Sequence, residues 1–218
     1  SILKAAFENL KNKDEMQKVD FNAAMEMSNR IMKDASVVPT ATILWLGESW
    51  AQVGESRGSV EQSKNGKFAK EAARMAAELF DAAIKRNDFP QKSLQAAQLR
   101  RIELLRRSGE VMQSLKQIED ILANEPNVFS LQIAAAQCLQ QVAVEYQRSS
   151  DLLAAIEGPS GFSPIWGWGK LVTTLHTTMY SASGTPRHAE QFGLAQYNLF
   201  WCRYQLALQI QDAGEKMR

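Results

Sequence analysis

The chain has 218 residues, of which 45% are hydrophobic and 22% are charged, and its formal net charge is +1 at pH 7. This length allows one large domain or two small ones, and the composition is ordinary for a globular protein. Because a charge so close to zero gives no overall field that attracts phosphate groups, we expect no nucleic acid partner, and any recognition must come from a local patch.

Strand-like alternation is almost absent, whereas apolar residues recur at spacings of three and four along most of the chain. In chain order, this periodicity predicts helices over residues 2–10, 17–34, 40–54, 68–86, 93–107, 110–124, 128–146, 151–157, 170–180 and 186–212. The polar stretch 55–66 is expected to be a loop or a frayed helix end, and Gly214 is expected to end the last helix. The sequence therefore predicts an all-α chain of about ten helices that pair with their sequence neighbours.

Targeting and membrane signals are missing from the chain. No apolar run reaches the roughly 20 residues that a transmembrane helix needs, so we expect no membrane insertion. The amphipathic pattern begins at the first residues, without a signal peptide. The chain does not begin with Met, so a removed leader and the compartment stay open.

The predicted helix over residues 40–54 carries a spacing that bears on packing. Leu46 and Trp50 lie one turn apart on one face, and Ile43 precedes them by a turn. Gly47 lies on an adjoining face, where the missing side chain lets a second helix approach closely. This stretch is therefore expected to be scaffold, with Gly47 serving close packing.

The next predicted helix completes a repeat-like unit, with Ala76 and Phe80 four residues apart and Pro90 ending the unit. Together the two helices resemble the tetratricopeptide repeat, whose signature is W-x2-L-G-x2-Y, then A-x3-F, then P. The unit departs from this signature because Ile43 replaces the first Trp, Trp50 replaces Tyr, and the connector between the helices is long.

Further along, Gly109 and Pro126 stand at the family spacing for an inter-helix turn and a terminal proline, and small residues recur at the close-packing positions Ala135, Ala136 and Ala207. The resemblance covers about two thirds of the chain. It implies a right-handed superhelix of antiparallel helix pairs, with repeats over residues 1–157 and a continuation of the array over residues 158–218. The alternative is an irregular helical bundle.

In this family the first helices of successive units line a concave groove that holds a peptide or a partner helix. The resemblance places these side chains in the groove: Trp45, Glu48, Gln52, Arg100, Glu103, Arg106, Arg107, Trp201 and Tyr204. It thus implies a non-enzymatic interaction or scaffolding module without a cofactor. The alternatives are a helical ligand-binding or enzymatic domain with a pocket near residues 158–169, and a purely structural spacer.

The run LRRIELLRR, residues 99–107, holds four arginines and allows two interpretations. In the first, it is a solvated helix face with Glu103 paired to Arg100 or Arg107. In the second, the arginines form a patch that binds an acidic partner, since guanidinium groups suit carboxylates and phosphates.

The connector of residues 158–169, GPSGFSPIWGWG, also allows two interpretations. Phe162, Trp166 and Trp168 either plug the end of the helical stack or present an aromatic surface. Because large aromatic side chains contribute most when they are buried, we favour the plug.

Catalytic and metal-binding patterns are poor. The only histidines, His176 and His188, have no Cys, Asp or Glu at ligand spacing, so we expect neither a metal site nor catalytic residues. The only cysteines, Cys138 and Cys202, lie in apolar helical runs typical of buried free thiols.

The last predicted helix is apolar on several faces, with Phe200, Trp201, Leu206, Leu208 and Ile210 among its residues. A repeat array normally ends in a helix with a polar outer face. We therefore expect either self-association into a homo-oligomer through this helix or a downstream segment that covers it.

Overall fold

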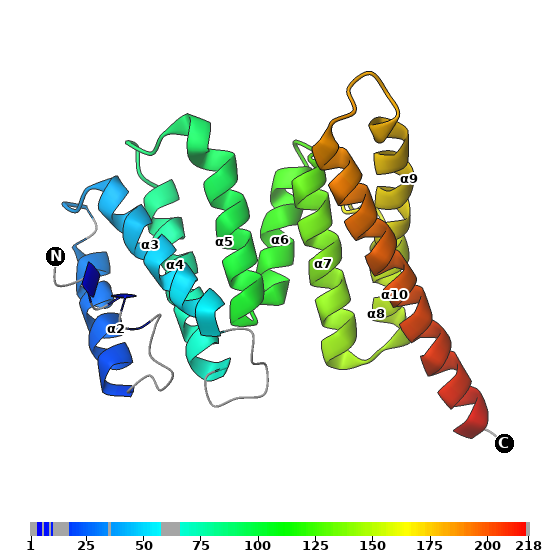
Figure 1. The fold of residues 1–218 in the computed structure, drawn as a ribbon, viewed down its shortest axis with the longest axis horizontal. Coiled ribbons are helices and arrows are strands. Elements are labelled where there is room, and N and C mark those ends of the chain that lie inside the picture. Colours follow the sequence, from blue (N-terminus) through cyan, green and yellow to red (C-terminus); the bar gives the residue numbers. More distant parts are fainter. Residues whose placement is uncertain are drawn as a thin grey trace. The chain divides into compact units, whose positions relative to one another are not determined.

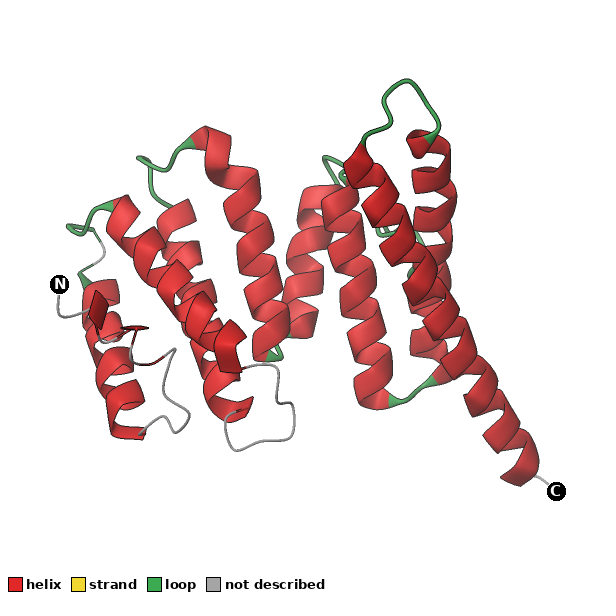
Figure 2. Ribbon diagram, viewed as in Figure 1, coloured by secondary structure: helices red, strands yellow, loops and turns green. Residues whose placement is uncertain are grey.

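The computed structural model describes residues 4–5, 7–8, 10, 18–34, 36–57 and 66–216. Within these ranges the chain is all-α, as predicted, and contains no strand (Figure 2). Its elements in chain order are α2 Lys18–Lys33, α3 Thr40–Arg57, α4 Gly66–Ile84, the 3-10 turn η1 Gln91–Ser93, α5 Leu94–Ser108, α6 Val111–Leu122, α7 Phe129–Tyr146, α8 Ser149–Glu157, α9 Trp168–Met179 and α10 Pro186–Lys216 (Figure 1).

The helix predicted over residues 2–10 lies partly outside the described residues, and of those described, residues 4, 5, 7, 8 and 10 are helical. Most of the predicted loop 55–66 lies outside them as well, and α3 continues to Arg57. At the other end of the chain, the expected stop at Gly214 is wrong, because α10 runs through it to Lys216.

The chain divides into two compact units, Ser1–Glu110 and Val111–Arg218. In the first unit α3 packs on α4 and α4 packs on α5, so neighbouring helices form pairs. In the second, α7 packs on both α6 and α8, and α10 packs on both α9 and α8. The connector of residues 158–169 lies inside the second unit.

Gly47 brings α3 and α4 together, as its predicted packing role requires. A Cβ atom built on Gly47 would lie 3.2 Å from the Phe80 ring and 3.4 Å from Cβ of Leu79, both on α4. The contact with the Phe80 ring is tighter than most Cβ contacts, so a side chain at position 47 would require this ring or α4 to shift by a few tenths of an ångström. Gly54, further along α3, is a second such position, because a Cβ atom built there would lie 3.2 Å from the carbonyl oxygen of Ala69 on α4.

The tryptophan of α3 at position 50 anchors the core of the first unit. Trp50 is fully buried, and its indole nitrogen donates a hydrogen bond of 2.8 Å to the hydroxyl of Ser28 on α2. The rings of Phe7 and Phe21 meet it edge-on, with centroids at 5.1 and 5.2 Å. A buried indole N–H needs such a partner, and the aromatic contacts add to the apolar burial. Trp50 is therefore scaffold, as predicted.

A buried glutamine fastens the connector of the second unit to α7. The side-chain amide nitrogen of Gln132 donates to the carbonyl oxygens of Pro126 and Pro164 at 2.8 and 2.9 Å. The side-chain amide oxygen of Gln132 accepts a hydrogen bond of 2.8 Å from the backbone N–H of Trp166. Gln132 has no exposed surface, so three of its hydrogen bonds are made where water cannot replace them.

The two connector tryptophans are buried, as the plug interpretation predicts. Trp168 is fully enclosed and donates through its indole nitrogen to Gln140 at 2.9 Å, and Trp166 is 8% exposed. Phe162 differs, because it lies at the exposed tip of the connector and contributes nothing to the plug.

The small residues predicted to let helices nestle have different surroundings. Ala135 and Ala136 on α7 are fully buried, which agrees with the prediction. Ala207 on α10 is exposed to solvent, so its predicted packing role is wrong. The reason is that α10 buries another face, which carries Ala195 and Cys202.

Candidate functional site

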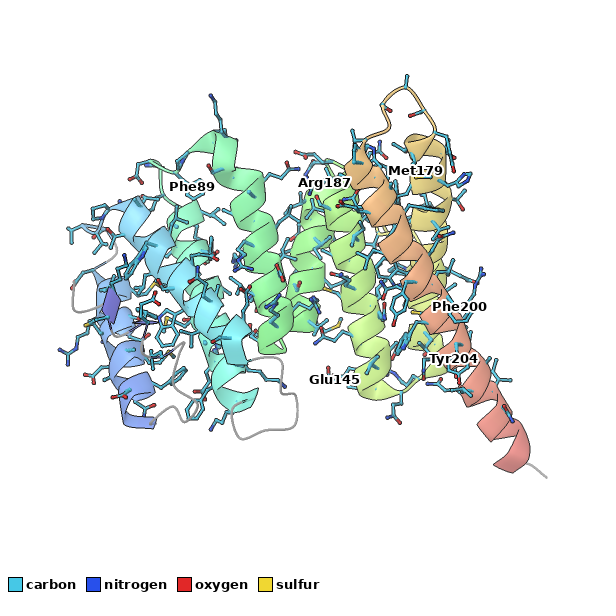
Figure 3. The ribbon with its side chains drawn as sticks, in the orientation of Figure 1. Phe89, Glu145, Met179, Arg187, Phe200 and Tyr204 are labelled. Carbon is cyan, nitrogen blue, oxygen red and sulfur yellow. The ribbon has the colours of Figure 1, made fainter. Side chains whose placement is uncertain are left out.

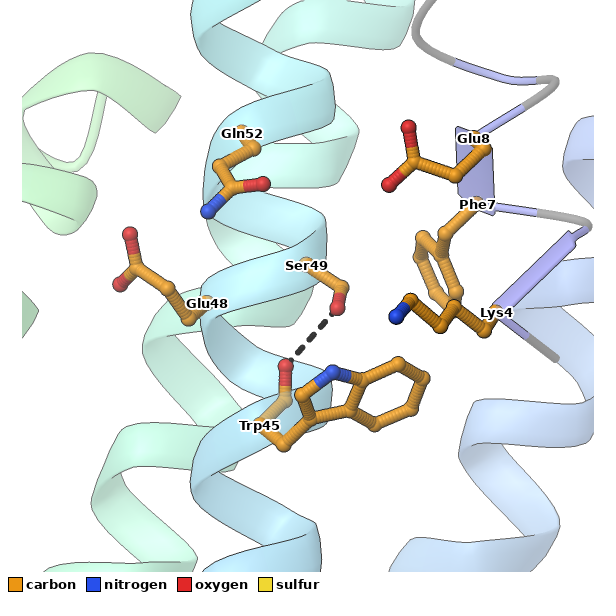
Figure 4. A pocket seen from close by; sticks show the side chains of 7 residues that line it. All are labelled: Lys4, Phe7, Glu8, Trp45, Glu48, Ser49 and Gln52. Carbon is orange, nitrogen blue, oxygen red and sulfur yellow. Dashed lines mark hydrogen bonds between the residues drawn. The ribbon is translucent and has the colours of Figure 1, made fainter. Parts of the chain in front are cut away.

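A cavity of about 170 Å³ lies on the first unit, between α3 and the helical residues near the N-terminus (Figure 4). We call it the Trp45 pocket. Its lining consists of Lys4, Phe7, Glu8, Trp45, Glu48, Ser49 and Gln52. Three of these residues, Trp45, Glu48 and Gln52, are ones that the repeat resemblance places in a groove. They share a helix face because spacings of three and four bring side chains to the same side of a helix.

The apolar wall of the pocket is Trp45, which remains 39% exposed. Its ring meets the Phe7 ring edge-on at a centroid distance of 6.0 Å, and Phe7 in turn packs on the buried Trp50. The Ser49 hydroxyl donates to the Trp45 carbonyl oxygen at 2.9 Å, the hydrogen bond dashed in Figure 4. The Phe7 ring thus supports the indole from the core side, and part of the indole faces solvent.

Polar groups surround this wall. Figure 4 shows the side chains of Lys4 and Glu8 on one side of the pocket and the amide of Gln52 on the other. The Glu48 carboxylate turns away from Phe7 and toward α5, where it meets Arg100. An apolar surface with a polar border is the usual composition of a protein docking site.

Arg100 connects α5 to α3 through two carboxylates. Its Nη2 and Nε atoms donate to the two oxygens of Glu48 at 2.8 and 3.2 Å, and its Nη1 atom lies 2.8 Å from Glu55. Burial opposes the charged form of Arg100, but the hydrogen bonds to Glu48 and Glu55 outweigh this and raise the pKa of the guanidinium above its ordinary value. Arg100 is therefore a permanent cation in this position.

Arg101 and Arg107 also meet carboxylates. Arg107 lies 3.4 Å from Glu55 and also pairs with Glu103, and Arg101 pairs with Asp81 of α4 at 3.0 Å. Arg106 is half-buried on the same helix. The helix thus contains the local pairs with Glu103 that were expected for a solvated face. It also forms ion pairs to α3 and α4, so these guanidinium groups are engaged within the first unit.

The predicted groove residues near the C-terminus belong to the second unit. Trp201 is half-buried on α10, and Tyr204 is 54% exposed on the same helix. Four lining residues of the Trp45 pocket were missed by the sequence reasoning: Lys4, Phe7, Glu8 and Ser49. The apolar spacing of Phe7 and Leu10 signals a buried helix face, but it does not say which helix that face meets.

Other chemistry has little support in the described ranges. No three His, Cys, Asp or Glu side chains gather there in a way that could hold a metal ion, and no helix there has the length and apolar character needed to cross a membrane. Cys138 and Cys202 are both fully buried free thiols. Burial raises the pKa of Cys202 to about 11, which disfavours the reactive thiolate. Near residues 158–169, where the alternative placed a pocket, Trp166 and Trp168 occupy the interior.

Comparison of the chain with models of protein families gave no match, and comparisons with curated proteins and with solved structures gave none either.

Proposed function

We propose that the first unit is a docking module that binds a protein or peptide by enclosing one of its side chains in the Trp45 pocket. The observation that carries this proposal is a half-exposed indole beside a cavity of about 170 Å³. A large aromatic group that packs against the protein on one side and reaches solvent on the other is the type of residue that dominates binding energy at protein interfaces.

The volume of the pocket favours a side chain over a cofactor or a metabolite. Small-molecule sites enclose roughly 300–1,000 Å³, whereas a cavity of about 150 Å³ accommodates one benzene-sized group. The Trp45 pocket is near the lower figure. A single anchor residue of a longer chain would fill it, and the rest of that chain would lie along the helix surface.

The ion pairs beside the pocket disfavour an acidic partner. Two guanidinium groups, Arg100 and Arg107, already face the three carboxylates of Glu48, Glu55 and Glu103. An acidic partner would have to displace these carboxylates from their arginines. The pairs therefore argue against the anion-binding interpretation of residues 99–107.

The same ion pairs support a role for α3 and α5 as a shared surface. According to the repeat resemblance, α3 and α5 are the first helices of two successive repeats, and the first helices of repeats line the groove. The contact between Glu48 and Arg100 joins them directly. A surface that is fixed before the partner arrives loses less conformational entropy on binding.

Peptide selection against the wild-type chain, with the Trp45→Ala variant as the counter-screen, tests the proposal. We expect selected peptides to share one anchor residue and to bind the variant at least about ten-fold more weakly, as hot-spot truncation does. The Phe162→Ala variant, altered at an exposed aromatic residue of the second unit, serves as the matched control and should bind as the wild type does.

The site of binding can be read directly, because the chain has five tryptophans. With 5-fluorotryptophan incorporated, we expect a selected peptide to shift the ¹⁹F resonance of Trp45 and to leave that of the buried Trp168 in place. Peptides that bind the wild type and the Trp45→Ala variant equally would refute the proposal.

A further inference from the structure

A stripe of exposed residues runs along one side of α10. Its members recur at alternating spacings of four and three and are all exposed: Gly193, Tyr197, Phe200, Tyr204, Ala207 and Gln211. This is the heptad spacing of the a and d positions in a coiled coil. We call these residues the α10 stripe.

The stripe is aromatic at its centre and almost uncharged along its length. Tyr197, Phe200 and Tyr204 are 66%, 72% and 54% exposed, and the last two lie one turn apart on the helix (Figure 3). Between residues 191 and 211 the only charged side chain is Arg203. The opposite face of α10 carries the fully buried Ala195 and Cys202, so the helix already meets its own unit through small residues.

We propose that the α10 stripe pairs with the α10 stripe of a second copy of this chain, with the two helices antiparallel and a two-fold axis that crosses the stripe at the level of position 202. In an antiparallel coiled coil each a residue lies opposite a d residue. When the midpoints of the two stripes are aligned, Phe200 lies opposite Tyr204 of the second copy. This alignment also places Tyr197 opposite Ala207, and Gly193 opposite Gln211.

The sizes of the side chains fit this register. Each end layer combines a large residue with a small one, and the central layers stack two aromatic rings, which is the complementarity that knobs-into-holes packing needs. A shift by one heptad would leave two members of the stripe without a partner, either Ala207 and Gln211 or Gly193 and Tyr197. A surface that matches its own reverse is the requirement for a closed two-fold dimer.

The area is sufficient for a specific pair. The three exposed aromatic rings, with the flanking Leu194, Leu208 and Ile210 at 40%, 38% and 63% exposure, offer about 600 Å² of mostly apolar surface per copy. The pair would therefore bury at most about 1,200 Å², which is the lower limit for stable complexes. We accordingly expect a reversible dimer whose population depends on concentration.

Arg203 flanks the stripe next to the proposed axis, so the pairing brings two copies of this arginine together. The resulting repulsion is weak and is screened by salt. This repulsion allows a test of the pairing. A chain with Arg203→Glu would pair better with the wild type than with itself, because only the mixed pair brings opposite charges together.

Sedimentation equilibrium of the chain, whose mass is 24.4 kDa, tests the dimer. We expect a concentration-dependent shift toward twice that mass, and we expect Phe200→Glu to weaken dimerisation by about 30-fold or more, since it puts a charge into the central layer. Phe162→Glu is the same change at an exposed residue outside the stripe and should leave the mass unchanged. A wild type that stays monomeric at about 200 µM, or a dimer indifferent to Phe200→Glu, would overturn the proposal.

Two further measurements test the register. In a mixture of Tyr197→Cys and Ala207→Cys chains oxidised with glutathione disulfide, we expect cross-links between the two variants in excess of cross-links within either one. Mixed wild-type and Arg203→Glu chains should form heterodimers above the statistical proportion. Cross-linking of each variant with itself instead would show a parallel pair and would contradict the proposed register.

Discussion

Arg100 on α5 binds the Glu48 carboxylate on α3 with two atoms, Nη2 at 2.8 Å and Nε at 3.2 Å. This fork-to-carboxylate geometry is the strongest form of ion pair available to side chains. It joins helices whose paired residues are 52 positions apart in the sequence, beside a pocket whose wall is Trp45. The pair therefore holds one element of the proposed docking surface against another.

Removing Arg100 should destabilise the first unit. The Arg100→Met change leaves Glu48, Glu55 and Glu103 close together without their shared cation, and we expect a loss of about 1–2 kcal/mol in the free energy of unfolding. The expected loss in the free energy of unfolding is small because these carboxylates are 35–43% exposed and water screens them. Urea unfolding followed by circular dichroism measures the loss.

A double-mutant cycle separates the pair from its surroundings. We expect Glu48→Gln and Arg100→Met to show a coupling free energy of about 1 kcal/mol. The control is Arg74→Met, which removes a 66% exposed arginine that pairs with Glu78 and Glu110. It should change stability by less than about 0.5 kcal/mol, because water screens an arginine as exposed as this one. A coupling free energy near zero would mean that the Glu48–Arg100 pair between α3 and α5 contributes nothing to stability.

The connector of the second unit should tolerate alanine at one glycine and not at another. A Cβ on Gly167 would lie 2.3 Å from the Gly158 nitrogen and 2.4 Å from the Ile156 carbonyl oxygen, both of them backbone atoms. We expect Gly167→Ala to cost at least about 3 kcal/mol, because this backbone must move or the end of α8 must unfold. The midpoint of thermal unfolding of the second unit measures the effect.

Gly161 is the matched control in the same connector. Its φ is 96°, but a Cβ there meets no atom within 4 Å, so Gly161→Ala should cost only the backbone strain of about 1–2 kcal/mol. If Gly167→Ala proved the milder of the two, the close approach of residues 158 and 167 would not exist in solution.

The sequence allowed local relationships to be predicted better than distant ones. Helix positions, the close packing at Gly47 and the shared face of Trp45, Glu48 and Gln52 all follow from spacings within one or two helices. The role of Arg100 could not be read in this way, because the partners of a charged side chain depend on which helices become neighbours. The pattern of residues 99–107 therefore indicated a patch or local pairs, while the fold also pairs the arginines with carboxylates on α3 and α4.

The C-terminal helix shows a second limit of the same kind. Small residues mark close packing only when they lie on the buried face, and the apolar pattern of α10 is too continuous to say which face that is. Ala207 was expected to pack, whereas Ala195 and Cys202 do so. Likewise Gly214 ends a helix only if the chain turns there, and α10 continues.

The carboxyl of Asp88 should titrate below its ordinary range. The Arg86 side chain, and after it the Thr40 hydroxyl at 2.7 Å, hydrogen-bond to the charged form and lower the pKa of Asp88. In a ¹³C carboxyl titration we expect Arg86→Gln to raise this pKa more than Thr40→Val does.

The lowered pKa of Asp88 determines how the free energy of unfolding depends on pH. Because the folded pKa of Asp88 is depressed, its contribution to stability is fully present above the ordinary carboxyl pKa of about 3.9 and is lost as pH falls through the lower folded value. Asp88→Asn should therefore flatten the acid limb of the stability curve. An Asp88 pKa that both substitutions leave unchanged would place its hydrogen-bond partners elsewhere.

Cys202 predicts a change of stability in the opposite pH range. Burial raises the pKa of its thiol from 9.0 to about 11, so the folded chain resists forming the thiolate and the unfolded chain does not. The contribution of Cys202 to the free energy of unfolding is therefore fully present below pH 9.0, and it falls as the pH rises from 9.0 toward 11. Urea midpoints measured across this window should decline more steeply for the wild type than for Cys202→Ala. At pH 8 a thiol reagent should label Cys202 only after urea unfolds the second unit, and rapid labelling of the folded chain would show that the face of α10 opposite the stripe is open to solvent.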